Sequence, residues 1–226
     1  MLSIKEVSFS FGSKSVLKDI EMDFALGSVT GILGRNGTGK TTLFRVLTKI
    51  YKQQSGVFIL NGSPLKPDDI AFMPTDPFFY PYMKGKEYLK IVANNDDELQ
   101  NAMKVTELLE LPLDLLVDNY STGMRKKLAF AAIFSLNKPI VILDEPYNGV
   151  DLESNEIIQS IIKRNHQNKI VMVSSHILST ITSTCDQVYL MSPDMPIQKF
   201  EAEEFDQLEI LMKESIDKKM DDFFGR

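Results

Sequence analysis

Residues 34–41 constrain the fold of this chain more than any other segment. They read GRNGTGKT, a complete G-x-x-x-x-G-K-[ST] pattern, between an apolar run at 29–33 and the helical pattern TTLFRVLTKI. Gly34, Gly37 and Gly39 allow a loop whose backbone N–H groups turn inward around phosphate oxygens, and the following helix points its positive end at the same anion. By chance the pattern arises in roughly one chain per hundred of this length. The segment therefore predicts a phosphate-binding loop between a strand and a helix.

Three side chains that follow the loop suit a nucleoside triphosphate with its metal. Lys40 brings a mobile positive charge to the terminal phosphates. The hydroxyl of Thr41 is a ligand for Mg²⁺, and Thr42 adds a phosphate contact. An ordinary glycine-rich turn is the alternative, but the strand and helix that flank the loop favour the nucleotide interpretation.

The segment IVILDE at 140–145 supplies the acidic half of such a site. Asp144 stands at the carboxyl end of a predicted buried strand, where a carboxylate beside the phosphate loop holds Mg²⁺ directly or through water. Glu145 follows it and is suited to orient and deprotonate an attacking water. Taken alone, an acidic pair that merely caps a strand is equally plausible. Two halves of one phosphoryl-transfer site in a single chain favour the catalytic interpretation.

The hydrophobic periodicity predicts an α/β fold. Residues 2–11 and 16–26 alternate apolar and polar side chains, which is typical of an antiparallel sheet with one wet face. Short apolar runs between polar residues indicate strands of a parallel sheet covered by helices. They lie at 29–33, 138–145 and 168–176. We therefore expect a phosphate-loop NTPase core with a mostly parallel sheet and an N-terminal antiparallel β lobe.

Two segments lie outside these strands. Residues 76–137 lack a strand pattern and carry amphipathic helical spacing interrupted at Asn94 to Asp97, so we expect a helical insertion of about these bounds. Residues 201–226 hold nine acidic and four basic residues, with an apolar stripe every three or four positions. The stripe consists of Phe205, Leu208, Met212, Ile216, Met220 and Phe223. We expect one ATPase domain at 1–200 and an acidic C-terminal helix that docks on its own core or on a second subunit.

Composition excludes several classes of function. The 25 Lys and Arg against 31 Asp and Glu give a formal net charge of −6, whereas a nucleic-acid-binding chain normally carries a basic surplus. Cys185 is the single cysteine and cannot form an intramolecular disulfide, and the first residues carry no secretory signal pattern. The longest purely apolar run, 128–134, is far shorter than the about 20 residues of a membrane span. We expect a cytoplasmic protein with no nucleic-acid partner, whose membrane contact goes through another chain.

Four motifs stand in the order and spacing of an ATP-binding cassette (ABC) ATPase, a family that the chain resembles over about residues 1–192. They are GRNGTGKTT, YSTGMRKKL at 120–128, IVILDEPYNGVD at 140–151 and the His176 of VSSHIL. The second motif separates this family from other phosphate-loop ATPases and usually reads LSGGQ. Here Ser121 and Gly123 match it, while its other three positions differ. The resulting S-x-G-M form is similar to that of the ATPase subunits of exporter-type transporters.

The resemblance assigns roles to individual residues. It implies that ATP is bound by Phe11, which stacks on adenine, and by the loop residues Gly34, Asn36, Gly37, Gly39, Lys40, Thr41 and Thr42. It makes Lys40, Glu145 and His176 the catalytic groups, with His176 hydrogen-bonded to the γ-phosphate as a switch. Ser121 and Gly123 resemble residues that contact the γ-phosphate held by the partner subunit. Asp151 resembles a residue that acts across the dimer.

One position departs from the family pattern. ABC ATPases usually place a Gln that touches Mg²⁺ on the loop between the core and the helical lobe, and the aligned stretch AFMPTDPFFYP puts Thr75 there. We expect the shorter side chain of Thr75 to offer an oxygen to the metal, together with Thr41 and Asp144. Either Asp76 substitutes for the missing Gln, or coupling through this loop is altered.

Two clusters flank these motifs. The aromatic residues Phe78, Phe79, Tyr80 and Tyr82 follow the Thr75 loop, where the family accepts a short cytoplasmic helix of its transmembrane partner; the core of the helical lobe is an equal alternative. The basic triplet Arg125, Lys126 and Lys127 follows the YSTGM segment. We interpret it as a solvated helix face or as an anchor for an acidic partner surface.

The resemblance implies the ATP-binding and ATP-hydrolysing subunit of an ABC transporter, held on the cytoplasmic face of the cell membrane by separate transmembrane permease subunits. Two such subunits, identical or homologous, would clamp two MgATP molecules at a two-fold interface. A soluble ABC-type ATPase acting on ribosomes or DNA is an alternative, although such proteins usually carry two cassettes or a long coiled-coil insertion. A regulatory nucleotide-binding module with weak hydrolysis is the other alternative, and Thr75 supports it.

Overall fold

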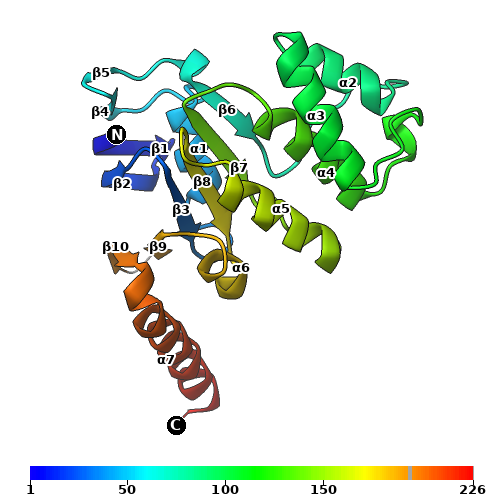
Figure 1. Cartoon of the computed structure of the whole chain (residues 1–226). Helices are drawn as coiled ribbons and strands as arrows, with labels where there is room; N and C mark the ends of the chain where they lie inside the picture. The colour runs from blue at the N-terminus through cyan, green and yellow to red at the C-terminus, as the bar shows by residue number, and fades with distance from the viewer. Residues whose placement is uncertain (193–194, 226) are drawn as a thin grey trace.

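Two β-sheets form the body of the protein (Figure 1). The structure is a computed structural model that describes residues 1–192 and 195–225, without the side chains at 215–219 and 221–224. The first sheet is antiparallel with strand order β2-β1-β4-β5. Its strands are β1 (Leu2–Phe11), β2 (Lys14–Phe24), β4 (Ser55–Leu60) and β5 (Ser63–Pro64). The antiparallel lobe expected from the alternation at 2–11 and 16–26 is therefore present.

The second sheet has the strand order β10-β9-β3-β8-β7-β6. Its strands are β3 (Ser28–Leu33), β6 (Ile70–Met73), β7 (Ile140–Asp144), β8 (Ile170–Ser175), β9 (Gln187–Ser192) and β10 (Met195–Glu201). All neighbours pair in parallel except the edge strand β10, which is antiparallel to β9. Every residue of β7 and β8 is buried, as strands covered on both faces require. The expected α/β class with a mostly parallel sheet is confirmed.

Helices cover both faces of this sheet. Alternate residues of β7 enter two separate hydrophobic clusters, Val141 and Leu143 in one and Ile140 and Ile142 in the other. The first cluster includes side chains of α5 (Leu152–Arg164) and α6 (Leu178–Thr182), and the second includes those of α1 (Lys40–Leu47). Because the side chains of a strand point alternately to opposite faces, the sheet lies between α1 and the β lobe on one side and α5 and α6 on the other.

The segment between β6 and β7 is helical. It contains α2 (Gly85–Val92), α3 (Asp96–Leu108) and α4 (Thr122–Phe134), which form a lobe beside the sheet (Figure 1). The interruption expected at 94–97 lies where α2 ends and Asn95 caps the N-terminus of α3 by accepting from the backbone of Glu98. Helix α4 packs against β6 and β7 as well as α2 and α3. The lobe is thus attached to the sheet mainly through α4.

A buried carboxylate also fastens this lobe to the sheet. Glu98 of α3 is 5% exposed and accepts from the backbone of Asn137, just before β7, at 2.7 Å. Its other oxygen accepts from the backbone and side chain of Asn94 at 2.8 and 2.9 Å. Burial opposes ionisation, but these hydrogen bonds outweigh it and hold the pKa of Glu98 below its ordinary value.

The C-terminal helix α7 (Phe205–Phe224) docks through its first turns and then leaves the body (Figure 1). Leu208 is fully buried, and Phe205, Leu211 and Met212 pack against the same cluster. Met220 is half exposed. The stripe positions Ile216 and Phe223 lie outside the described side chains. No helix in residues 1–192 and 195–225 is long and apolar enough to cross a membrane.

Replacing Glu98 with glutamine is expected to lower the free energy of unfolding by about 1–3 kcal/mol at pH 7, because the amide accepts more weakly and brings unpaired donors. The control Glu107→Gln, on an exposed position of the same helix, is expected to change it by less than about 0.5 kcal/mol. Chemical denaturation measures the free energy of unfolding of wild type and of both variants.

The difference in the free energy of unfolding between wild type and Glu98→Gln is also expected to depend on pH. The folded-state pKa of Glu98 lies below the unfolded value of 4.5. The contribution of the ionised Glu98 carboxylate to the free energy of unfolding is therefore fully present above pH 4.5 and is lost as the pH falls through the folded-state pKa. A pH-independent difference between the two proteins from pH 7 to pH 3 would contradict this account.

Candidate functional site

The parallel strands bring the sequence motifs to one edge of the sheet. The pairs Leu33↔Ser175 and Asp144↔Ser174 fix the register of β3, β8 and β7. Because parallel strands end at the same edge, the phosphate loop after β3, Glu145 after β7 and His176 after β8 lie together. The loop after β6 brings Thr75 to the same edge.

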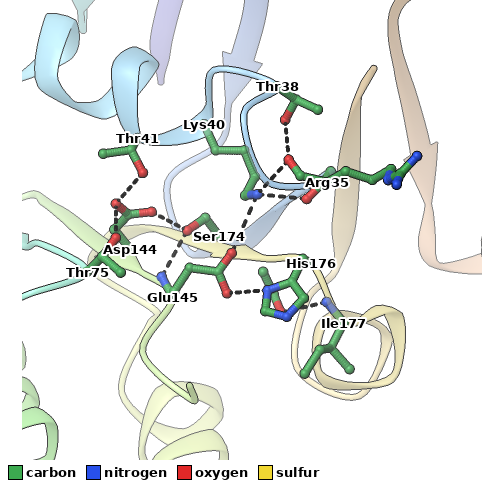
Figure 2. A network of polar contacts seen from close by, with 12 residues as sticks. Arg35, Thr38, Lys40, Thr41, Thr75, Asp144, Glu145, Ser174, His176 and Ile177 are labelled. Carbon is green, nitrogen blue, oxygen red and sulfur yellow. Dashed lines mark hydrogen bonds and ion pairs between the residues drawn. The ribbon is translucent and has the colours of Figure 1, made fainter. Parts of the chain in front are cut away.

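The phosphate loop wraps around the ammonium of Lys40 (Figure 2). Lys40 Nζ donates to the carbonyls of Gly34 at 2.7 Å and Arg35 at 3.3 Å, and its side chain is 6% exposed. Two glycines make this path possible: Gly39 has φ +103°, and a Cβ at Gly34 would lie 2.5 Å from the carbonyl oxygen of Met191. The Lys40 charge is therefore held inside its own loop.

Asp144 is the centre of the polar network (Figure 2). Its Oδ2 accepts from Thr41 Oγ1 at 2.7 Å and Thr75 Oγ1 at 2.6 Å, and its Oδ1 accepts from Ser174 Oγ at 2.5 Å. The carboxylate is fully buried. The three predicted metal ligands Thr41, Thr75 and Asp144 thus converge on one point, and Ser174 holds the carboxylate from the opposite side.

This set of donors fits Mg²⁺. Two hydroxyls and one carboxylate are hard oxygen ligands, and Mg²⁺ uses one or two such groups together with waters and substrate phosphates. Within residues 1–192 and 195–225, no three His, Cys, Asp or Glu side chains form a group that could hold an ion. Oxygen ligands of this kind suit a metal that is also bound by the phosphates of a nucleotide.

Glu145 lies between the side chains of Lys40 and His176. Its Oε1 is 3.5 Å from Lys40 Nζ, and its Oε2 is 3.0 Å from His176 Nδ1. The backbone of Glu145 adopts φ +52°, and its N–H donates to Ser174 Oγ at 2.9 Å. Oε1 is buried without a hydrogen-bond partner; at 3.5 Å the Lys40 contact is an ion pair only. A buried carboxylate oxygen with unused accepting capacity is suited to take a proton from a water in the cavity.

A cavity of about 460 Å³ opens in front of these groups. Its lining combines loop, strand and helix residues: Phe11, Lys14, Val16, Asn36, Gly37, Gly39, Lys40, Thr41, Thr42, Thr75, Glu145, Asn148 and His176. Phe11 stands at its rim, 49% exposed, with edge-to-face contacts to Phe9 and Tyr51. Its free face can stack on a planar base. The lining thus combines an aromatic side chain, the phosphate loop and the carboxylate of Glu145.

Five predicted site residues are not among those that line the cavity. Gly34 and Asp144 are hydrogen-bonded to lining residues, and the other three are Ser121, Gly123 and Asp151. Ser121 caps α4 by accepting from the backbone of Met124, and Asp151 caps α5 by accepting from the backbone and hydroxyl of Ser154. The Ser154 hydrogen bonds hold the pKa of Asp151 below its ordinary value. At Gly123 an added Cβ would lie 2.6 Å from the carbonyl oxygen of Gly149. Ser121 and Asp151 are exposed and Gly123 is partly buried; that these residues act on a partner's nucleotide stays a prediction.

The structure corrects the interpretation of the basic triplet. Lys126 is not solvated: it is 4% exposed, and its Nζ donates to the carbonyl of Glu145 at 2.8 Å. Lys127 lies 3.6 Å from Asp151 and donates to Ser154 at 3.1 Å. Consecutive residues of a helix point in different directions, and here two of them point into the protein. A run of charges in a sequence does not show which of them are buried.

The aromatic cluster after Thr75 is mostly on the surface. Phe78, Tyr80 and Tyr82 are 71%, 60% and 82% exposed, whereas Phe79 packs against Tyr88 and the core. The alternative that these residues form the core of the helical lobe is therefore wrong for three of the four.

Sequence reasoning also missed three contributors to the site. Ser174 was part of an apolar strand pattern, and nothing in that pattern marked its hydroxyl as a partner of Asp144. Lys14 and Val16 belong to β2 and reach the cavity only because β1 and β2 pair across the turn after Phe11. A search for polar residues in strands next to the acidic strand would have found Ser174.

The sequence and the fold of this chain are similar to those of known proteins. A family model described as "ABC transporter" matches residues 17–148, more than half of the chain. The chain is 32% identical over 204 residues to the uncharacterized ABC transporter ATP-binding protein YdbJ of Bacillus subtilis (strain 168), covering 84% of this chain and 66% of that protein. It is 27% identical over 219 residues to an ATP-dependent lipid A-core flippase of Photobacterium profundum, covering 88% of this chain but 37% of the flippase.

A solved structure described as an ATP binding subunit of an ABC transporter superimposes with a TM-score of 0.82 at 22% identity, over 90% of this chain and 91% of the other. A bacterial Atm1-family ABC exporter with ATP bound gives a TM-score of 0.81 at 20% identity, over 94% of this chain and 40% of the exporter. At these identities the likeness concerns the fold.

Ser174→Ala is expected to lower the free energy of unfolding by about 1–3 kcal/mol, because it leaves Asp144 Oδ1 and the N–H of Glu145 buried with one partner fewer. The control Ser179→Ala, at an exposed helical position, is expected to change it by less than about 0.5 kcal/mol. Urea unfolding curves compare the two variants. Equal stability of Ser174→Ala and wild type would show that the hydroxyl does not support the site.

Proposed function

This chain belongs to the ABC transporter family, and on that premise we propose that it binds MgATP in the cavity beside Lys40 and hydrolyses it to power a transporter. One observation carries the proposal: Asp144, Glu145 and Lys40 meet at the mouth of a phosphate loop, with Thr41 and Thr75 on the same carboxylate. The unit responsible is residues 1–200, with the helical insertion at about 76–137; residues 201–226 are an accessory tail.

Each group has a distinct role in the reaction. Lys40 exchanges its bonds to Gly34 and Arg35 for the terminal phosphate oxygens and neutralises their charge. Asn36, Gly37 and Thr42 supply further contacts to the phosphates, and Phe11 stacks on the base. Thr41, Asp144 and Thr75 would hold Mg²⁺, which would supply positive charge to the phosphates during the reaction.

Hydrolysis follows from the position of Glu145. Its carboxylate orients a water and takes one of its protons, the water oxygen attacks the γ-phosphorus, and the bond to the β–γ bridging oxygen breaks. The products are ADP and inorganic phosphate. His176 Nδ1 lies 3.0 Å from Glu145 Oε2, and we propose that His176 turns to the γ-phosphate of a bound ATP. The carboxylate is then released for the water.

The site is completed by a second ATPase subunit, identical or homologous. Ser121 and Gly123 of one subunit would contact the γ-phosphate bound to the other, and Asp151 would act across the interface. ATP thereby favours a closed dimer, which reopens when the γ-phosphate is lost. Separate transmembrane permease subunits would hold this dimer on the cytoplasmic face of the membrane. The exposed aromatic residues Phe78, Tyr80 and Tyr82 support a docking surface for such a partner.

Glu145→Gln is expected to lower the rate of phosphate release by about a hundredfold or more, because an amide takes no proton from water. The dissociation constant for MgATP is expected to stay within about threefold of wild type, so the variant accumulates as an ATP-dependent dimer. Phosphate release and light scattering measure the two effects. The control Glu156→Gln, on an exposed position of α5, should behave as wild type; wild-type turnover by Glu145→Gln would remove Glu145 as the base.

Lys40→Ala is expected to weaken MgATP binding by roughly tenfold to a hundredfold, since it deletes a charge-assisted contact to the phosphates. Lys52→Ala provides the control, because Lys52 is an exposed lysine just after α1. Titration calorimetry compares the two dissociation constants. An undiminished affinity of the Lys40 variant would mean that the loop does not hold the phosphates.

A further inference from the structure

Lys126 is a buried cation that the roles above do not use. It lies in the first turns of α4, with 4% of its surface exposed, and its Nζ donates to the main-chain carbonyl of Glu145 at 2.8 Å. Burial lowers the pKa of Lys126, while the carboxylates of Asp76, Glu145 and Asp144 act in the opposite direction. An ammonium in such a place is retained only where it has partners, and its partner here is the peptide that carries the proposed base.

The backbone of Glu145 needs such a partner. Its φ of +52° is unfavourable for a residue with a side chain, and such conformations persist only when the surroundings hold them. The N–H of Glu145 is held by Ser174, and its carbonyl is held by Lys126. These two hydrogen bonds hold the main chain of Glu145 from β8 on one side and from α4 on the other. The direction of the Glu145 carboxylate is therefore set by its main chain as well as by His176.

The neighbours of Lys126 do not share this contact. Arg125 donates to the carbonyl of Asp118 at 3.3 Å, and Lys127 contacts Ser154 and Asp151. Among the three basic residues, Lys126 is the one that donates to Glu145. The contact spans 19 residues and joins the helical lobe directly to the acidic end of the parallel sheet.

We propose that Lys126 is a positioning residue for hydrolysis: its ammonium clamps the carbonyl of Glu145 and keeps the left-handed peptide that aims the carboxylate into the cavity. Lys126 itself does not line the cavity, so it acts on ATP only through Glu145. The proposal rests on the assignment of Glu145 as the base. It predicts an effect on turnover that is separate from nucleotide binding.

Steady-state kinetics of the full chain test this role with two variants. Lys126→Met keeps the length of the side chain but removes its donor, and is expected to lower kcat by about tenfold or more with KM for MgATP within about threefold of wild type. Lys126→Arg restores a cationic donor and is expected to keep kcat within about threefold of wild type. Lys104→Met, an exposed lysine of α3, controls for the loss of charge and should match wild type. A wild-type kcat for Lys126→Met, or equal losses in the Met and Arg variants, would overturn the proposal.

Amide hydrogen exchange provides a readout that does not depend on activity. In Lys126→Met, the segment 143–149 is expected to exchange at least about fivefold faster, while 157–163 of α5 is expected to stay unchanged. If wild type released no phosphate but this local change occurred, the ATPase assignment would fail and the clamp would stand. An unchanged exchange rate at 143–149 would overturn the clamp whatever the ATPase assay shows, and equal acceleration in both segments would show general destabilisation instead.

Discussion

The rest of the site depends on the hydrogen bonds that the carboxylate of Asp144 accepts. This carboxylate accepts hydrogen bonds from Thr41 at the start of α1, Thr75 after β6 and Ser174 in β8, which lie 103, 69 and 30 residues away in the sequence. Buried carboxylates are costly unless they are fully hydrogen-bonded. The fold satisfies this requirement with hydroxyls that are also oxygen ligands for a metal. The same group therefore joins three segments of the chain, and in the proposed function it would also hold the metal of MgATP.

The site is assembled from segments that belong to different parts of the fold. The parallel sheet fixes Asp144 and Ser174 in register, and the β lobe brings Phe11 to the rim of the cavity. The helical lobe reaches the same place from the other side, through Lys126 on the carbonyl of Glu145. Ser121 and Gly123 lie at the start of the same helix but do not line the cavity. Helix α4 therefore carries the Lys126 contact, and Ser121 and Gly123 lie at its N-terminus.

Much of this arrangement follows from the sequence, for reasons that are local. The phosphate loop and the apolar strands each consist of contiguous residues. The glycines of the loop and the spacing of apolar residues in the strands therefore predict the structure directly. Strand β6 has only four residues and was not predicted, although it positions Thr75. The burial of Lys126 was missed because it depends on where α4 packs, which no spacing of charges reveals. Ser174 was missed for the same reason, since its partner lies 30 residues away on the neighbouring strand.

We propose above that this geometry makes the chain a magnesium-dependent ATPase. The most direct test of this proposal is the time course of phosphate release from the purified wild-type protein with ATP, measured once with Mg²⁺ and once with a chelator. We predict saturable release with Mg²⁺ and none above background without it, because Asp144, Thr41 and Thr75 have no role in hydrolysis without the metal. No release in either condition, or equal release in both, would contradict the account.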